Sequence, residues 1–110
     1  MFRTELNQNR KENIMKTRQD VIHAISNVQH PAIAYSLLEL GIVKDIDLNE
    51  NLVTITFAFP FPNIPIAGQL VNSISMPIQS LGFDFKYKIV VMTEEEKIKF
   101  MEMETKGWKG

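Results

Sequence analysis

The sequence predicts an α+β domain, built as a two-layer α/β sandwich with an α-β-β-α-β core, a three-stranded mixed sheet and a C-terminal helix. Two strand-like segments follow one another across a turn of hairpin length, which predicts an antiparallel pair. A third strand-like segment comes only after a long helical segment, which acts as a crossover. With 110 residues, 45% of them hydrophobic, the chain has the size and composition of one globular domain with its own core.

The first helix is predicted over residues 17–29, where apolar side chains recur at helical spacing. His30 and Pro31 should end it, because the residue before a proline is pushed out of the α region. A short helical turn is then expected over residues 33–40. Gly41 should close this turn in the left-handed conformation, which glycine adopts without strain.

The hairpin is predicted to join a strand over residues 42–48 to a strand over residues 52–59. In the second of these strands, apolar side chains alternate with Thr and Ala, as in a strand with one buried face. The residues expected on the buried face are Val53, Ile55, Phe57 and Phe59.

The second helix is predicted from residue 64 or 65 to residue 81, with Asn63 as its N-cap and Pro65 in its first turn. Pro77 lies inside this segment. A proline there removes one backbone hydrogen bond and clashes with the preceding turn, so the helix should either kink or break near Ser73.

The third strand is predicted over residues 83–92, with aromatic and β-branched side chains on one face and lysines on the other. Thr93 and Glu96 form the capping-box pattern that opens a last helix, over residues 94–105. The residues expected on the buried side of this helix are Ile98, Met101 and Phe100. The chain thus divides into a polar N-terminal arm (1–16), a main domain (17–92) and a C-terminal helix with a tail (93–110).

Composition excludes several classes of function. The net charge is −1, so no overall positive field attracts nucleic acid or an anionic membrane. There is no cysteine, which excludes disulfides, thiolate catalysis and cysteine-ligated metal clusters within the chain. No apolar run is long enough to span a bilayer or to form a signal peptide, and a cytoplasmic location is expected.

Few side chains offer reactive chemistry. His23 and His30 are the only histidines, and two histidines make a poor zinc site because three or four protein ligands are usual. Asp45 and Asp47 share a strand face on which a solubilising role is expected. We therefore predict no catalytic residue, no metal site, no bound cofactor and no enzymatic activity.

The segment between the second strand and the second helix is the most specialised part of the chain. It carries Pro60, Pro62 and Pro65 among apolar side chains. A preorganised loop loses little conformational entropy on binding, which favours an apolar docking patch. The alternative is a rigid, buried connection without a binding role.

Two motifs resemble a known family. Residues 25–31 (Ile-Ser-Asn-Val-Gln-His-Pro) end a helix at a proline, and residues 40–46 (Leu-Gly-Ile-Val-Lys-Asp-Ile) lead into the first strand. Their order and spacing, with the strand, proline loop and helix over 53–81, resemble an iron–sulfur cluster assembly (FSCA) domain. The phenylacetate-degradation protein D and the N-terminal domain of Mrp-type ATPases belong to that family. The resemblance implies the fold given above. It also implies a function in the delivery of iron–sulfur clusters or in the maturation of iron–sulfur proteins.

The departures from the family pattern fall on its functional positions. The family's Asp-Pro-Glu motif is His30, Pro31 and Ala32 here, so both acids are missing. The family's loop Cys-Pro pair, whose cysteine is the candidate cluster ligand, is Ile64 and Pro65 here. The resemblance therefore implies an adaptor or accessory factor that does not itself ligate a cluster.

The expected partner is a protein, for which the iron–sulfur assembly machinery is the candidate. The residues expected to bind it are His30, Pro31, Ala32, Phe61, Asn63, Ile64 and Pro65. Three alternatives stay open at this point. The chain could be a structural domain that self-associates as a homodimer through a strand edge or the last helix, a weak histidine-dependent metal-binding protein, or an enzyme using His23 or His30.

Overall fold

The structure, a computed structural model, describes residues 17–109 as three helices and a three-stranded sheet. The elements are α2 (Arg18–Ile25), β1 (Val43–Asn49), β2 (Leu52–Phe59), α3 (Ala67–Ser80), β3 (Asp84–Val91) and α4 (Glu94–Gly107). The predicted α-β-β-α-β order with a C-terminal helix is confirmed. The predicted N-terminal arm, residues 1–16, lies outside the described residues.

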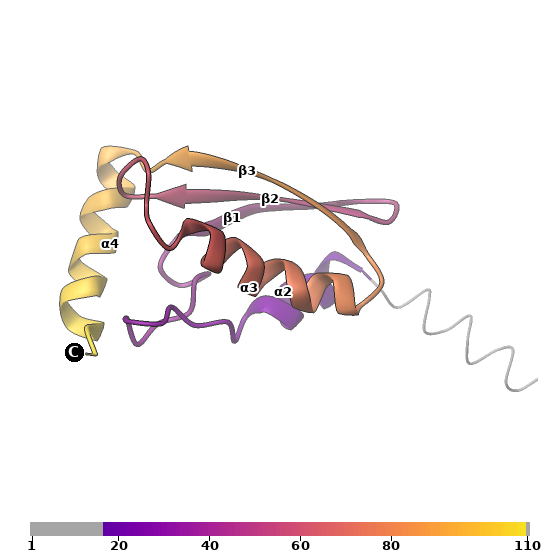
Figure 1. The fold of residues 1–110 in the computed structure, drawn as a ribbon, viewed down its shortest axis with the longest axis horizontal. Helices are drawn as coiled ribbons and strands as arrows, with labels where there is room; N and C mark the ends of the chain where they lie inside the picture. The colour runs from indigo at the N-terminus through magenta and orange to yellow at the C-terminus, as the bar shows by residue number, and fades with distance from the viewer. Residues whose placement is uncertain (1–16, 110) are drawn as a thin grey trace, which may run out of the picture.

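The sheet is mixed, as predicted, and has the order β1-β2-β3. β1 and β2 form the antiparallel hairpin, while β2 and β3 run parallel from the pair Leu52–Asp84 to the pair Phe59–Val91. The helices α2 and α3 lie side by side on one face of the sheet, and α4 crosses its end where β2 and β3 finish (Figure 1). The core lies between the sheet and the α2–α3 layer, with Phe57, Ile25 and Ile74 fully buried. Each such side chain contributes about 1.5–3 kcal/mol.

The first helix ends earlier than predicted, at Ile25 rather than residue 29. The Ser26 hydroxyl donates to the His23 carbonyl, and the Ser26 and Val28 N–H groups also donate to carbonyls three residues back, so the α-helical pattern is lost. The short helical turn predicted over residues 33–40 forms only in its second half, where the Leu40 N–H donates to the Ser36 carbonyl four residues back. That segment forms two isolated β-bridges and a turn ending at Gly41, whose φ of 79° confirms the left-handed position.

The hairpin strands depart from simple alternation. β1 has a β-bulge between Lys44 and Asp47, with Asp45 at a φ of 52°, so its side chains do not keep one face. β2 is buried on both faces: Thr56 is only 3% exposed and Ala58 is fully buried. The register neighbours of Thr56 are Lys44 in β1 and Lys88 in β3, and long lysine stems can cover such a small side chain.

The second helix begins later than predicted, at Ala67, so Pro65 precedes it and Asn63 is not its N-cap. Ile66 occupies the N-cap position without a side-chain hydrogen bond, and Asn63 adopts a φ of 59° in the loop. The helix does not break at Pro77, which lies inside the continuous α3. The proline-rich segment is therefore a longer loop than the sequence indicated.

The last helix opens with the predicted capping box: the Glu96 N–H donates to Thr93 Oγ1, and the Thr93 N–H donates to Glu96 Oε1. The Thr93 hydrogen bond, followed by the Lys44 ammonium at 3.0 Å, holds the pKa of Glu96 below its ordinary value. The predicted buried side is wrong in part. Phe100 is 5% exposed, but Ile98 and Met101 are 55% and 45% exposed, because α4 meets the rest of the domain only along its Phe100 side.

Candidate functional site

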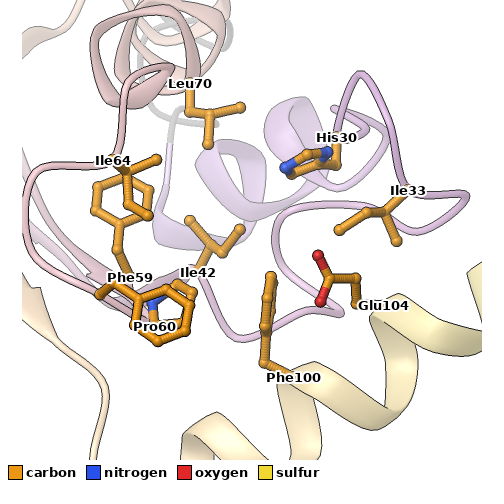
Figure 2. A pocket seen from close by; sticks show the side chains of 10 residues that line it. His30, Ile33, Ile42, Phe59, Pro60, Ile64, Leu70, Phe100 and Glu104 are labelled. Atoms are coloured by element: carbon orange, nitrogen blue, oxygen red, sulfur yellow. The ribbon is translucent and has the colours of Figure 1, made fainter. Parts of the chain in front are cut away.

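A cavity of about 160 Å³ opens where the loop after β2, the His30 loop and α4 come together (Figure 2). Pro60 directly follows β2 and is buried with Phe59, while Pro62 and Pro65 further restrict the loop. The backbone that forms this wall is therefore preorganised. The cavity is lined by His30, Ile33, Ile42, Phe59, Pro60, Phe61, Ile64, Leu70, Phe100 and Glu104.

Most of the cavity wall is apolar. The side chains of Phe59, Ile64 and Leu70 surround it on the side of the loop and α3, and Phe100 enters from α4 (Figure 2). An apolar group that leaves water for such a wall gains about 25 cal/mol per Å² of buried surface. The cavity is therefore suited to an apolar side chain or a small apolar ligand.

His30 and Glu104 are the ionisable residues of the lining. His30 is 9% exposed, and its Nδ1 accepts a hydrogen bond from the Ala32 N–H at 3.0 Å, so the neutral ring carries its proton on Nε2. Burial lowers the pKa of His30 below its ordinary value; the Glu104 charge raises it and the Lys109 charge lowers it, each less strongly. At neutral pH the cavity thus presents an N–H donor and a carboxylate acceptor.

Stability should depend on pH through His30. Its folded-state pKa lies below the unfolded value of 6.5, so the native state binds fewer protons between these two values. The free energy of unfolding should therefore be highest above pH 6.5 and fall as the pH drops through it, by at most about 1.4 kcal/mol per pH unit. His30→Asn keeps an acceptor for the Ala32 N–H and should flatten this fall in urea titrations from pH 5 to 8. His23→Asn, at an exposed position in α2, is the control and should retain it.

Three of the residues predicted to bind a partner line the cavity: His30, Phe61 and Ile64. The Phe61 ring is half exposed, and the Lys97 ammonium of α4 lies 5.0 Å from its centroid. Ala32 acts through its backbone, by donating to His30. The other predicted residues, Pro31, Asn63 and Pro65, are exposed and lie outside the lining.

The prediction missed Glu104 and the part that α4 plays in the site. Glu104 follows Phe100 by one helical turn, so both side chains project from the same face of α4. Its carboxylate points toward the cavity from the side opposite Leu70 (Figure 2). A search for a polar residue one turn from a buried aromatic side chain would have found it, if Phe100 alone, without Ile98 and Met101, had been taken as the buried residue.

Among the described residues, no group of three or more His, Asp or Glu side chains is arranged to hold a metal ion. His23 is exposed on α2, whereas His30 lies beyond the end of that helix and has its Nδ1 occupied. Across residues 17–109, no helix is long and apolar enough to cross a membrane.

The order of elements and the cavity beside the proline loop define a small two-layer α+β domain with its site at a strand-to-helix connection. A family model described as iron–sulfur cluster assembly protein matches residues 18–84, which is more than half of the chain, and the chain belongs to this family. The family expected from the motifs is thus confirmed.

Two similar proteins can be compared with this chain. An "Fe-S protein maturation auxiliary factor" from Porphyromonas gingivalis is 26% identical over 91 residues, which cover 82% of this chain and 87% of that protein. The crystal structure of a domain of unknown function, DUF59, from Bacillus anthracis superposes with a TM-score of 0.55 at 20% identity. It covers 74% of this chain and 88% of that one. The predicted fold is therefore confirmed by a solved structure.

Proposed function

We propose that this chain is a non-enzymatic accessory factor in the maturation of iron–sulfur proteins. It acts in the cytoplasm as an adaptor that binds a protein partner and does not ligate a cluster. Membership of the cluster-assembly family supports the process, and the name of the Porphyromonas gingivalis relative supports an auxiliary role. The observation that carries the adaptor role is the preorganised apolar cavity between the proline loop and α4.

The proposed partner inserts an apolar side chain into the cavity. Phe61 is half exposed at the loop and offers a ring against which the inserted group can pack. The His30 imidazole and the Glu104 carboxylate supply a donor and an acceptor for the polar backbone around that group. Buried aromatic contacts of this kind contribute much of the energy of protein interfaces.

The composition of the site supports the proposed absence of cluster ligation. Iron–sulfur clusters are held mainly by cysteine thiolates, and the whole sequence has none. Ile64, which the resemblance places at the family's cysteine position, contributes an aliphatic side chain to the cavity wall. A cluster in transit would therefore be held by the partner and not by this chain.

Anaerobic incubation with ferrous iron and sulfide is expected to leave the full chain without a cluster. After desalting, visible absorbance and iron content should both fall far below one cluster per chain. A stable, stoichiometric cluster would show that the chain has a ligand set that its cysteine-free sequence does not reveal.

Phe61→Ala is expected to weaken partner binding about tenfold or more, because it removes the exposed aromatic anchor of the cavity. The measurement is quantitative affinity capture from the organism that encodes the chain, with recovery of cluster-assembly components or iron–sulfur clients as the readout. Met76→Ala is the matched control, because Met76 is a similarly exposed apolar residue of α3 outside the cavity. Equal losses in both variants, or capture of unrelated proteins only, would contradict the proposal.

A further inference from the structure

Among residues 17–109, nothing pairs with the outer edge of β3. In the order β1-β2-β3 this strand pairs only with β2, and Figure 1 shows no other described element along its outer side. Every residue of β3 is exposed or half-buried. A long, exposed edge strand pairs readily with another strand unless a bulge, a proline or a charge prevents it.

The backbone groups that face this open edge belong to the apolar residues of β3. The N–H groups of Asp84 and Met92 donate to the carbonyls of Asn51 and Phe59, so the even-numbered residues turn their N–H groups toward β2. Because the direction alternates along a strand, the odd-numbered residues turn their N–H and C=O groups outward. These outward-facing residues are Phe85, Tyr87, Ile89 and Val91.

Three of these residues carry partly exposed apolar side chains that continue the buried layer of β2 out to the edge of the sheet. Tyr87, Ile89 and Val91 are 51%, 50% and 50% exposed, and they share the face of the buried residues Ile55 and Phe57 of β2. The Tyr87 ring and the buried Phe57 ring meet edge to face, with 5.8 Å between their centroids. The apolar layer on this face of the sheet thus reaches the outer edge of β3, where about half of each of these three side chains is exposed to solvent.

We propose that β3 pairs antiparallel with β3 of a second copy of this chain, about a two-fold axis at Ile89. Ile89 then faces Ile89 of the second copy, and Tyr87 faces Val91 of the second copy in both directions. These residues carry the outward backbone groups, so each facing pair exchanges two hydrogen bonds. The same patch serves both copies, as a closed two-fold dimer requires, and one sheet runs through both molecules.

The charges along β3 favour a second copy as the occupant and Ile89 as the centre. Lys86 and Lys88 lie in the first half of the strand, whereas Glu94 and Glu95 follow its end. With the axis at Ile89, Lys86 of each strand lies diagonally across from Glu94 of the other, although Asp84 then faces Glu94. A centre at Lys88 would instead place that lysine opposite itself, and like charges in facing positions are destabilising.

The other edge of the sheet does not offer this contact. β1 carries the bulge between Lys44 and Asp47 and the left-handed Asp45, and such features blunt an edge strand. β3 has no bulge in its pairing with β2 over its full length. Of the two sheet edges, strand pairing is therefore assigned to β3 and not to β1.

Light scattering coupled to size exclusion is expected to give twice the chain mass of 12.7 kDa for the full chain at tens of micromolar. Ile89→Glu and Ile89→Lys should each halve that mass, because like charges then meet at the axis. An equimolar mixture of the two variants should restore the doubled mass, since position 89 faces position 89. Met76→Glu, which places a charge on an exposed apolar site of α3, should leave the dimer intact.

Circular dichroism of each variant distinguishes dissociation of the dimer from unfolding of the chain. If a variant at position 89 does not fold, Val91→Lys is the alternative variant expected to be monomeric. A wild-type chain that has the mass of one copy at every concentration would overturn the proposal, as would a dimer that survives both Ile89 variants. The proposal rests on β3 and not on the cavity, so its failure would leave the proposed function standing.

Discussion

Replacing Phe100 with alanine is expected to lower the free energy of unfolding by about 3–5 kcal/mol. Phe100 is the buried aromatic side chain of α4, 5% exposed, and it forms part of the cavity wall. The substitution removes the burial of a large aromatic group and enlarges a hollow that is already present. Since a domain of this size has a total stability of about 5–15 kcal/mol, the loss is a large part of it.

The same substitution should detach α4 before the sheet unfolds. Phe100 is the large buried side chain of the helix. The other contacts of the helix include the half-buried Met103, the partly exposed Lys44–Glu96 pair, which contributes little, and the end of the helix, where Gly107 packs beside Tyr35 and accepts a hydrogen bond from the Ala34 N–H. Urea unfolding followed by circular dichroism should therefore show a first transition that removes part of the helix signal together with the near-ultraviolet signal of Trp108 at the end of α4. The sheet should unfold only at higher urea. Phe100→Ala would then no longer fit a two-state transition.

Met101→Ala is the control for Phe100→Ala, because it truncates the neighbouring residue of the same helix at a 45% exposed position. It should change the free energy of unfolding by no more than about 0.5 kcal/mol. A loss below about 1 kcal/mol for Phe100→Ala would show that α4 is held by contacts other than this side chain.

The order and type of the elements were predictable because local patterns and tertiary packing agree over most of the chain. β2 was predicted with its bounds, since strict alternation of apolar side chains continues from Val53 to Phe59. The capping box of α4 was predicted because Thr93 and Glu96 satisfy each other locally. Features of this kind depend on residues a few positions apart, and the sequence displays them directly.

The errors arose where distant contacts decide the local structure. The early end of α2 accompanies a bridge from Gln29 to Ser36, and no periodicity in the segment shows that bridge. The choice of Phe100 over Ile98 as the buried residue of α4 depends on where the proline loop lies. Apolar residues occur on several sides of this helix, so its own pattern could not select a face.

The candidate site was predictable on one side only. The His30 loop and the proline loop were found because prolines and the family motifs mark them, and the structure brings His30, Phe61 and Ile64 to one cavity. Glu104 comes from an element far along the chain whose orientation was predicted incorrectly. Its place beside His30 follows from tertiary packing, which a single sequence does not specify.

Gly107→Ala is expected to lower the free energy of unfolding by about 1–2 kcal/mol, as the balance of two opposed effects. Alanine is favoured over glycine in a helix by up to about 1 kcal/mol, and by less at Gly107 because it ends α4. A Cβ there would lie 2.8 Å from two atoms of the Tyr35 ring and 3.1 Å from Ile33 Cγ2. The backbone has little room to retreat, because the Ala34 N–H donates to the Gly107 carbonyl at 2.7 Å. Overpacking of this kind costs about 1–3 kcal/mol and should prevail.

Gly68→Ala tests the helix effect alone, since nothing lies within 4 Å of its added Cβ at the start of α3. It should raise the free energy of unfolding by about 0.4–1 kcal/mol. In a Tyr35→Ala background, most of the cost of Gly107→Ala should disappear, because the ring that the new methyl group meets has been removed. A Gly107→Ala variant as stable as the wild type would contradict this prediction. It would show that the half-buried Tyr35 ring moves aside freely. The contact between the end of α4 and the loop beside the cavity would then not depend on glycine.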